Sequence, residues 1–439
     1  MIPQLSLAIR DVTVIDGTGA PARAGATVLI SGAEIVAVTG GDDAAGADAV
    51  EVIEGGGRYL IPGLWETQAH TCDSGARHRT PWYVVPPGGR ELIAANLRTY
   101  LRRGITTVVD LGGRTDVLVD ARAAQRDGSI LGARLLLSGA HFNWPAGAFI
   151  APWMNRLVGS VAEARAEAER ALTEERVDIL KIVFSHGDPA NPLGKMSPEV
   201  LRAIVERGHA HGVPSAVHAD SAGDILAAVE AGVDSPEHMF APEGGERWRE
   251  DRARVIEAVN AADAYWPLSI ALFEAEAHAR DGAWLGAHAG EVPQELLDVA
   301  QSDPESLWLT LSDRDRDDAA ARLEAALETA LVAHEAGVRM TISSDSGVCA
   351  IFHGVGTLRE MELHEEAGVP NLAILTMATK HAAEKLGHGE RLGTIEVGKL
   401  ADLVLLDADP LASIANVRKI HAVIQGGRPL RAGDLAASG

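Results

Sequence analysis

The sequence contains little cysteine and little positive charge. Only Cys72 and Cys349 occur in 439 residues, which excludes a disulfide framework and a four-cysteine zinc site. Lysine and arginine number 39 against 62 aspartates and glutamates, so the formal net charge is −23. Such an acidic surface repels nucleic-acid phosphates and anionic lipids, so we expect neither nucleic acid nor a membrane among the partners.

Long hydrophobic runs are also absent. No stretch approaches the ~20 apolar residues that a membrane span needs, and the N-terminal MIPQLSLAIRDVTVIDG lacks the pattern of a signal peptide. Hydrophobic residues make up 46% and charged residues 23% of the chain, which is typical of a globular protein. We expect a cytoplasmic protein that forms a homo-oligomer and acts on a small-molecule substrate.

Short alternating runs at both ends of the chain predict strands. LAIRDVTVID and ATVLISGAEIVAVTG lie near the start, and RLGTIEVGKLADLVLLD and KIHAVIQGGRPL lie near the end. Val, Ile and Thr at period two, broken by glycine turns, are typical of antiparallel strands. We therefore expect a small β-sandwich built from both chain termini, with its halves at 1–60 and 386–439.

In residues 61–385, short apolar runs alternate with amphipathic helical stretches, a pattern that is typical of repeated βα units. One helix is expected to begin after Ser197 and to end at Gly212, and the charged stretch 241–318 is interpreted as a loop and helices over one end of this domain. Strands are expected near 64–70, 105–111, 134–140, 178–184, 215–219, 234–238, 263–270 and 338–345. The pattern predicts an α/β fold, a (β/α)8 TIM-type barrel.

Functional groups in such barrels lie at the C-terminal ends of the strands. Gln68 and His70 project from the same face because they are two apart on a strand. Taken alone, a histidine in an apolar run is more often a core residue, Lys181 can pair with Asp178, and Asp345 can cap a turn. The polar residues expected at strand ends are Gln68, His70, Asp110, His141, Lys181, His218, His238 and Asp345. Their joint occurrence favours one metal site.

Imidazole and carboxylate ligands suit a borderline divalent ion, and zinc is the ion we expect. Zinc lowers the pKa of a bound water to about 7, which makes hydroxide available at neutral pH. Asp345 could take the proton of that water and pass it to a leaving amine, as general base and then acid. The hypothesis is a metal-dependent hydrolase that cleaves the C–N bond of an amide, dipeptide-like or cyclic amide substrate, with Asp345 and His238 as catalytic residues.

The chain resembles the amidohydrolase superfamily, within its imidazolonepropionase-like and prolidase-like branch. The resemblance runs through VIDGTG, YLIPGLWETQAH, GITTVVDLGG, DILKI, AVHADSAGDILAAVEAGVDSPEH, ISSDSG and RLGTIEVGKLADLVLLDADPL. It implies a barrel flanked by a β-sandwich from both termini. It also implies His70, Lys181, His218, His238 and Asp345 as metal ligands, with Asp345 as the proton shuttle. In relatives the matching lysine can be carboxylated by carbon dioxide and then bridges two metals.

Gln68 departs from the family pattern, which has histidine at this place of the His-x-His motif. A carboxamide oxygen is a weaker ligand than imidazole, so the more buried metal position should lose affinity. Either Lys181, His218 and His238 hold a single ion, which we favour, or Gln68 binds through its oxygen or a water and two ions remain. Two alternatives to hydrolysis stay open: a lyase, isomerase or deaminase on this scaffold, or a degenerate barrel that only binds a small ligand.

The segment SGAHFNWPAGAFIAPWMNR is rich in aromatic residues for a chain with only 4% of them. Aromatic side chains often form the walls of small-molecule pockets. His141, Trp144 and Trp153, together with His353 after the last strand, are therefore candidates for substrate contacts. The alternative is that the two tryptophans pack beneath the 241–318 stretch.

Overall fold

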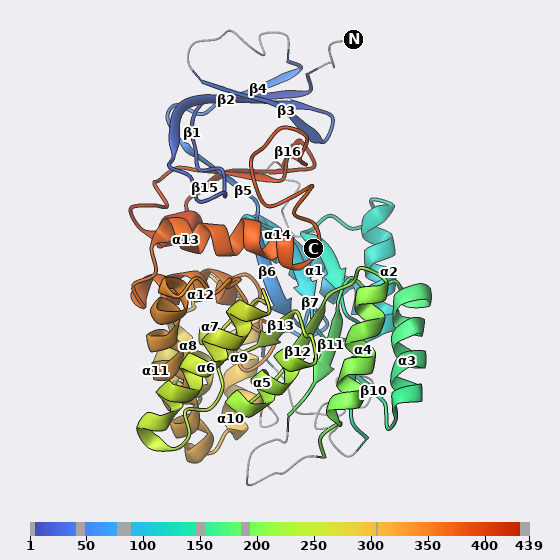
Figure 1. Ribbon diagram of the computed structural model, residues 1–439. Coiled ribbons are helices and arrows are strands. Elements are labelled where there is room, and N and C mark those ends of the chain that lie inside the picture. The colour runs from blue at the N-terminus through green and yellow to red at the C-terminus, as the bar shows by residue number, and fades with distance from the viewer. Residues whose placement is uncertain are drawn as a thin grey trace.

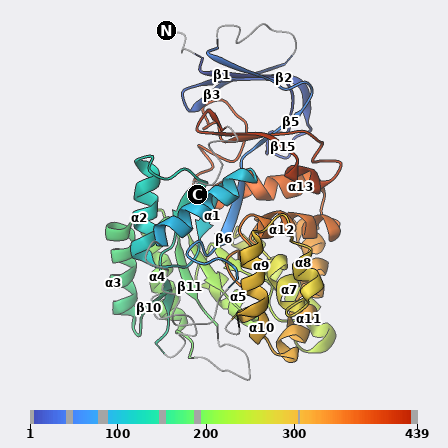
Figure 2. The ribbon, with the colours of Figure 1, turned by 180° about the vertical axis from the view of Figure 1, so that it is seen from behind.

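The computed structural model describes residues 5–40, 49–76, 89–145, 154–185, 194–303 and 306–430. A sheet made from both ends of the chain lies at one end of the molecule, and parallel strands surrounded by helices make up the remainder (Figures 1 and 2). Within these ranges, no helix combines the length and the apolar composition that crossing a bilayer requires.

The terminal sheet joins strands that are far apart in the sequence. Its members are β1 (Leu7–Val14), β2 (Arg23–Ser31), β3 (Glu34–Gly40), β4 (Glu51–Glu54), β5 (Tyr59–Pro62), β14 (Leu403–Leu406), β15 (Ile420–Gln425) and β16 (Arg428–Leu430). The order is β16-β15-β14-β5-β1-β2-β3, with β4 also paired to β1. Strand β5 is parallel to β1 and antiparallel to β14, so it connects the two ends. The expected union of both termini in one β unit is confirmed.

The barrel contains two groups of parallel strands. The first is β6 (Leu64–Ala69), β7 (Ile105–Asp110) and β8 (Arg134–Leu137), and the second is β9 (His141–Asn143), β10 (Asn155–Leu157), β11 (Leu180–Val183), β12 (Ser215–His218) and β13 (Ser235–Glu237). A backbone hydrogen bond of 2.8 Å from Asp178 N to Leu137 O connects the two groups.

Two extended segments close the wall where regular strands were expected at 263–270 and 338–345. Tyr265 N donates to Asp234 O at 2.9 Å, and Trp266 N donates to Arg339 O at 3.0 Å. Thr67 N then donates to Ile342 O at 3.0 Å, which closes the circle back to β6. These segments form isolated bridges, and each ends at a left-handed residue, Ser269 or Asp345. The predicted barrel fold is confirmed.

Helices cover the outside of the barrel. They are α1 (Gly89–Arg102), α2 (Thr115–Arg126), α3 (Val161–Arg170), α4 (Pro198–Ala210), α5 (Ala222–Glu230), α6 (Trp248–Ala261), α7 (Ile270–Ala277), α8 (Gly282–Gly286), α9 (Gln294–Ser302), α10 (Leu307–Thr310), α11 (Asp313–Glu335), α12 (Val355–Glu366), α13 (Asn371–Thr376) and α14 (Ala382–Lys385). Ser197 caps α4 by accepting from Val200 N, as expected. The 241–318 stretch forms α6 to α10 and the start of α11, and α8 to α10 pack around Leu285 and Trp308 together with Cys349 and Phe352 from the segment after Asp345.

One buried ion pair ties the barrel to the helices next to the terminal sheet. Lys385 Nζ on α14 donates to Glu237 Oε1 on β13 at 2.7 Å, and neither side chain is exposed. Ser235 Oγ donates to the same oxygen at 2.8 Å. Because both charges are out of water, removing one of them leaves the other without compensation.

We expect Lys385→Met to lower the free energy of unfolding by about 3–5 kcal/mol, because the Glu237 carboxylate would stay buried and unpaired. Urea denaturation measures the change. The double variant Glu237→Gln/Lys385→Met should recover most of the loss. Lys380→Met, which removes an exposed pair with Glu384, is the control and should change stability by less than about 0.5 kcal/mol. Equal stability of Lys385→Met and the original protein would contradict this account.

Candidate metal and catalytic site

Gln68 and His70 meet Asp345 at the C-terminal end of the first barrel strand. Gln68 Nε2 donates to Asp345 Oδ1 at 3.0 Å and lies 3.3 Å from His238 Nε2. His70 Nε2 lies 2.9 Å from the same Asp345 oxygen, and His70 Nδ1 lies 2.8 Å from Gly112 O. The structure therefore brings together side chains from three strand ends that are up to 277 residues apart.

The charges of His70 and Asp345 stabilise each other. Burial acts to lower the pKa of His70, but the hydrogen bond and charge of Asp345 outweigh it and raise that pKa to about 9. Burial acts to raise the pKa of Asp345, but His70, with smaller effects from His238 and Lys181, holds it well below the usual range. Asp345 is therefore a carboxylate in this site. Its backbone is left-handed, with φ of 59°, which turns the chain at the barrel mouth.

His238 and His218 lie side by side. Their ring centroids are 4.9 Å apart, with the rings edge to face at 67°. His238 Nδ1 lies 3.0 Å from Ser269 Oγ, and the Trp266 indole donates to His238 O at 3.0 Å. Burial, helped by the charge of His218, holds the pKa of His238 well below its usual value, so this imidazole is neutral. A neutral imidazole is the form that binds metals.

Asp220 and Arg322 are polar neighbours of His218 that the sequence did not reveal. His218 Nε2 lies 3.3 Å from Asp220 Oδ2, Ser185 donates to the same oxygen, and Arg322 approaches the other oxygen at 3.6 Å. Asp220 follows His218 by two residues, so the same-face rule applied to Gln68 and His70 would have identified it. Arg322 lies on α11, and nothing in the sequence of that helix distinguishes it.

Lys181 is the buried amine of the site. Its side chain is 2% exposed, and Nζ has no hydrogen-bond partner within the described part of the chain. Burial lowers the pKa of Lys181, and the charges of Glu237 and Asp345 oppose this effect. A buried amine without a partner is costly unless a ligand or a modification engages it. Lys181 is thus the residue of the predicted set that most needs a partner.

Two further carboxylates hold the loops around the site in place. Asp110 accepts from Thr71 N at 2.7 Å and from Gly112 N at 3.0 Å, so it anchors the turns that follow β6 and β7. Glu66, which sequence reasoning missed, accepts from Ser344 and Thr357 and joins β6 to the segment that carries Asp345. Burial raises the pKa of Glu66 to about 7, although these hydrogen bonds oppose it.

The predicted substrate-contact residues lie in different settings. His141 is buried edge to face with His70, with ring centroids 6.1 Å apart, and Gly112 is required beside it because a Cβ there would approach the ring to 1.8 Å. Trp144 is half-buried against the main core. His353 uses both ring nitrogens, at 2.9 Å from Tyr100 OH and 2.7 Å from Asp73 O. Trp153 lies outside the described residues.

The expected ligand side chains are already engaged with each other to different degrees. Among the described residues, no three His, Cys, Asp or Glu side chains are already grouped around one point, because they pair with each other instead. Lys181 has no partner among the described residues, and the His218 and His238 rings lie side by side, with His218 Nε2 at 3.3 Å from Asp220. A second metal ion would need Asp345 and His70 as ligands. These two side chains are hydrogen-bonded to each other, and the Gln68 amide also donates to Asp345.

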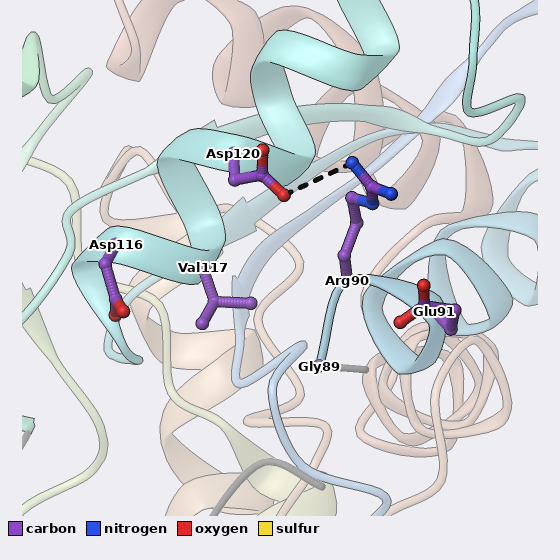
Figure 3. A pocket seen from close by; sticks show the side chains of 6 residues that line it. All are labelled: Gly89, Arg90, Glu91, Asp116, Val117 and Asp120. Carbon is purple, nitrogen blue, oxygen red and sulfur yellow. Dashed lines mark ion pairs between the residues drawn. The ribbon is translucent and has the colours of Figure 1, made fainter. Parts of the chain in front are cut away.

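An open hollow of about 410 Å³ lies elsewhere, between the first turns of α1 and α2 (Figure 3). It is lined by Gly89, Arg90, Glu91, Asp116, Val117 and Asp120, and Arg90 pairs with Asp120 at 3.5 Å. The lining contains no histidine, cysteine, serine, threonine or lysine. It shares no residue with the site described above.

Comparison with known proteins shows the family. The model of the amidohydrolase family matches residues 59–430, and the chain therefore belongs to this family. It is an enzyme of a class that acts on amide-type bonds and whose members generally bind divalent metals.

The similar proteins are distant in sequence and close in fold. The ochratoxinase of Aspergillus niger is 23% identical over 394 residues, which cover 83% of this chain and 73% of that protein. Its crystal structure matches with a TM-score of 0.76 at 20% identity over 97% of this chain and 95% of that one. The structure of a Xaa-Pro dipeptidase matches with a TM-score of 0.76 at 22% identity, over 97% of this chain and 99% of that one. The structure of phenylurea hydrolase B matches with a TM-score of 0.76 at 23% identity, over 97% of each chain.

The setting of His353 predicts acid sensitivity. Burial lowers the pKa of His353 from 6.5 to about 4, so the unfolded chain binds a proton between these values that the folded chain does not. The free energy of unfolding should fall as the pH drops from 6.5 to 4, by up to about 3 kcal/mol from this residue. His353→Gln should flatten the pH dependence of urea unfolding in this window. His334→Gln on α11 is the control, and an unchanged slope in His353→Gln would contradict the assignment.

Proposed function

We propose that the chain is a metal-dependent hydrolase that cleaves the C–N bond of a small amide, dipeptide-like or cyclic amide substrate. The observation that supports this most directly is the meeting of Gln68, His70, His238 and an ionised Asp345 at the barrel mouth. The names of the similar proteins, a Xaa-Pro dipeptidase, an ochratoxinase and a phenylurea hydrolase, agree with hydrolysis of small amide-type substrates.

Lys181, His218 and His238 would hold the divalent ion, with zinc as the expected metal. When bound, the ion supplies Lewis acidity, which acidifies a water molecule and polarises the scissile carbonyl. Lys181 can contribute as a carbamate after reaction with carbon dioxide. That reaction needs the neutral amine, and burial, which lowers the pKa of Lys181, favours this form.

Asp345 would carry the proton. Its Oδ1 accepts from His70 and Gln68, and among the described residues none donates to Oδ2, which leaves that oxygen to face water. The carboxylate takes a proton from the attacking water and donates it to the leaving nitrogen as the C–N bond breaks. Burial opposes ionisation of Asp345, but His70, with smaller effects from His238 and Lys181, holds its pKa low, so the carboxylic acid that forms gives up its proton readily to the leaving nitrogen.

A substrate panel tests the reaction class. The metal-loaded protein is incubated with N-acyl amino acids, Xaa-Pro dipeptides and lactams, and new amine and carboxylate are quantified. Hydrolysis predicts equal amounts of the two products and their loss after treatment with a chelator. Products formed without uptake of water would favour a lyase or isomerase. A metal-loaded protein that binds panel members and releases no product would favour a binding barrel.

Asp345→Asn should lower kcat by at least ~100-fold, because the amide cannot accept the proton of water. The fold should persist, since an amide occupies the same volume, and circular dichroism with thermal unfolding checks this. Asp298→Asn, on the exposed face of α9, is the matched control and should keep normal turnover. Near-normal turnover in Asp345→Asn would remove Asp345 from proton transfer.

A further inference from the structure

The orientation of the Gln68 amide follows from its contacts. Gln68 Nε2 donates to Asp345 Oδ1 at 3.0 Å, so the NH2 group faces the carboxyl group. The amide oxygen then faces the opposite way, where Ser343 Oγ donates to it at 3.4 Å. Gln68 therefore presents hydrogens, not its oxygen, to Asp345.

A chain of hydrogen bonds with one consistent direction keeps this orientation. The second N–H of Gln68 points at His238 Nε2, which must then carry a lone pair. His238 Nδ1 consequently bears the proton and donates to Ser269 Oγ at 3.0 Å. Ser269 Oγ and Ser343 Oγ are 3.2 Å apart, so the Ser269 hydroxyl is left to donate to Ser343, whose own hydrogen goes to Gln68. Each hydrogen in this closed ring of hydrogen bonds, from Gln68 through His238, Ser269 and Ser343 back to Gln68, therefore meets an acceptor.

The serine in this ring of hydrogen bonds that precedes α7, Ser269, is held in place by the start of that helix. Ser269 directly precedes α7, and the buried Glu360 accepts from Ile270 N at 3.1 Å and from Ala271 N at 2.6 Å. This carboxylate satisfies the first amides of α7 and so fixes the turn that carries Ser269. Ser343 lies two residues before Asp345 on the same extended segment, so both face the interior together.

We infer that the NH2 group of Gln68 takes the place of the more buried of two metal ions, so that the chain binds one divalent ion and not two. An ion at that position would have to bridge the Asp345 carboxylate and the first-strand side chains. Here an amide hydrogen is donated to the same Asp345 oxygen, and the only ligating atom of Gln68 lies on the opposite side of the amide, 3.4 Å from Ser343 Oγ. Binding of the remaining ion would take the His238 Nε2 lone pair from the 3.3 Å contact with Gln68, and the amide would keep its shorter 3.0 Å hydrogen bond to Asp345.

Gln68→Glu tests this at constant volume. The substitution replaces the NH2 group with an acceptor beside Asp345, and two carboxylates at this distance either share a proton or bind a cation. Zinc in excess supplies the cation. The full-length protein is stripped with a chelator, dialysed against Zn²⁺, freed of excess metal, and analysed for zinc per chain. We expect one zinc in the original protein and two in Gln68→Glu. Gln68→Met, which offers neither donor nor oxygen, is the control and should stay at one.

Ser343 gives a second test that leaves Gln68 in place. In Ser343→Ala the amide oxygen is released and can turn toward an ion, so a weak second zinc should be measurable by competition with a chelating dye. Ser343→Thr keeps the hydroxyl and should behave like the original protein. The opposite arrangement, in which Ser343 orients the Gln68 oxygen as a metal ligand, makes different predictions. The original protein would then hold two zinc ions, and Ser343→Ala would lose one of them. That result would overturn the inference.

Because this is the site assigned to hydrolysis, the inference rests on the proposed function, but zinc uptake and product formation are measured separately. A gain of one zinc from the original protein to Gln68→Glu supports the role of the amide even when no panel substrate is cleaved. Two zinc ions in the original protein, or no gain in Gln68→Glu, would overturn it even when hydrolysis is observed.

Discussion

The site depends on one buried carboxylate that must be neutralised away from water. Asp345 Oδ1 receives hydrogens from both His70 and Gln68, and these two contacts compensate its charge inside the barrel mouth. The left-handed backbone at Asp345 and the anchoring of the neighbouring Ser344 by Glu66 keep the carboxylate in that position. If the charge were not compensated, burial would protonate Asp345, and it could no longer act as a base.

Regular strands give way at the seventh and eighth segments of the barrel wall. These segments form isolated bridges, and each ends at a left-handed residue, Ser269 or Asp345, whose side chain contacts the site. Backbone hydrogen bonds still join them to their neighbours, for example His238 N to Pro267 O at 3.0 Å. Thr67 Oγ1 adds a side-chain bond of 2.8 Å to Ile342 O. The segments thus stay joined to the wall while their ends carry site residues.

Much of this could be predicted from the sequence. Period-two runs at both ends and repeated βα units predicted the sheet and the barrel, because these patterns depend on local burial. Gln68, His70, His238 and Asp345 were predicted as neighbours from their places at strand ends. Ser269 was missed because it was counted within the strand expected at 263–270, whereas it directly precedes α7 and turns into the site. Ser343 and Asp220 had a signal, since each lies two residues from a predicted site residue on the same face. The direction of the Gln68 amide could not be predicted, because it depends on partners from three other segments.

Anomalous scattering at the metal absorption edge, from crystals of the protein purified without added chelator, tests the central claim most directly. The account predicts one peak within bonding distance of His218 and His238, with the Gln68 amide nitrogen on Asp345 Oδ1. Two peaks bridged by Lys181 with the Gln68 oxygen as a ligand, or no peak between the two imidazoles, would contradict it.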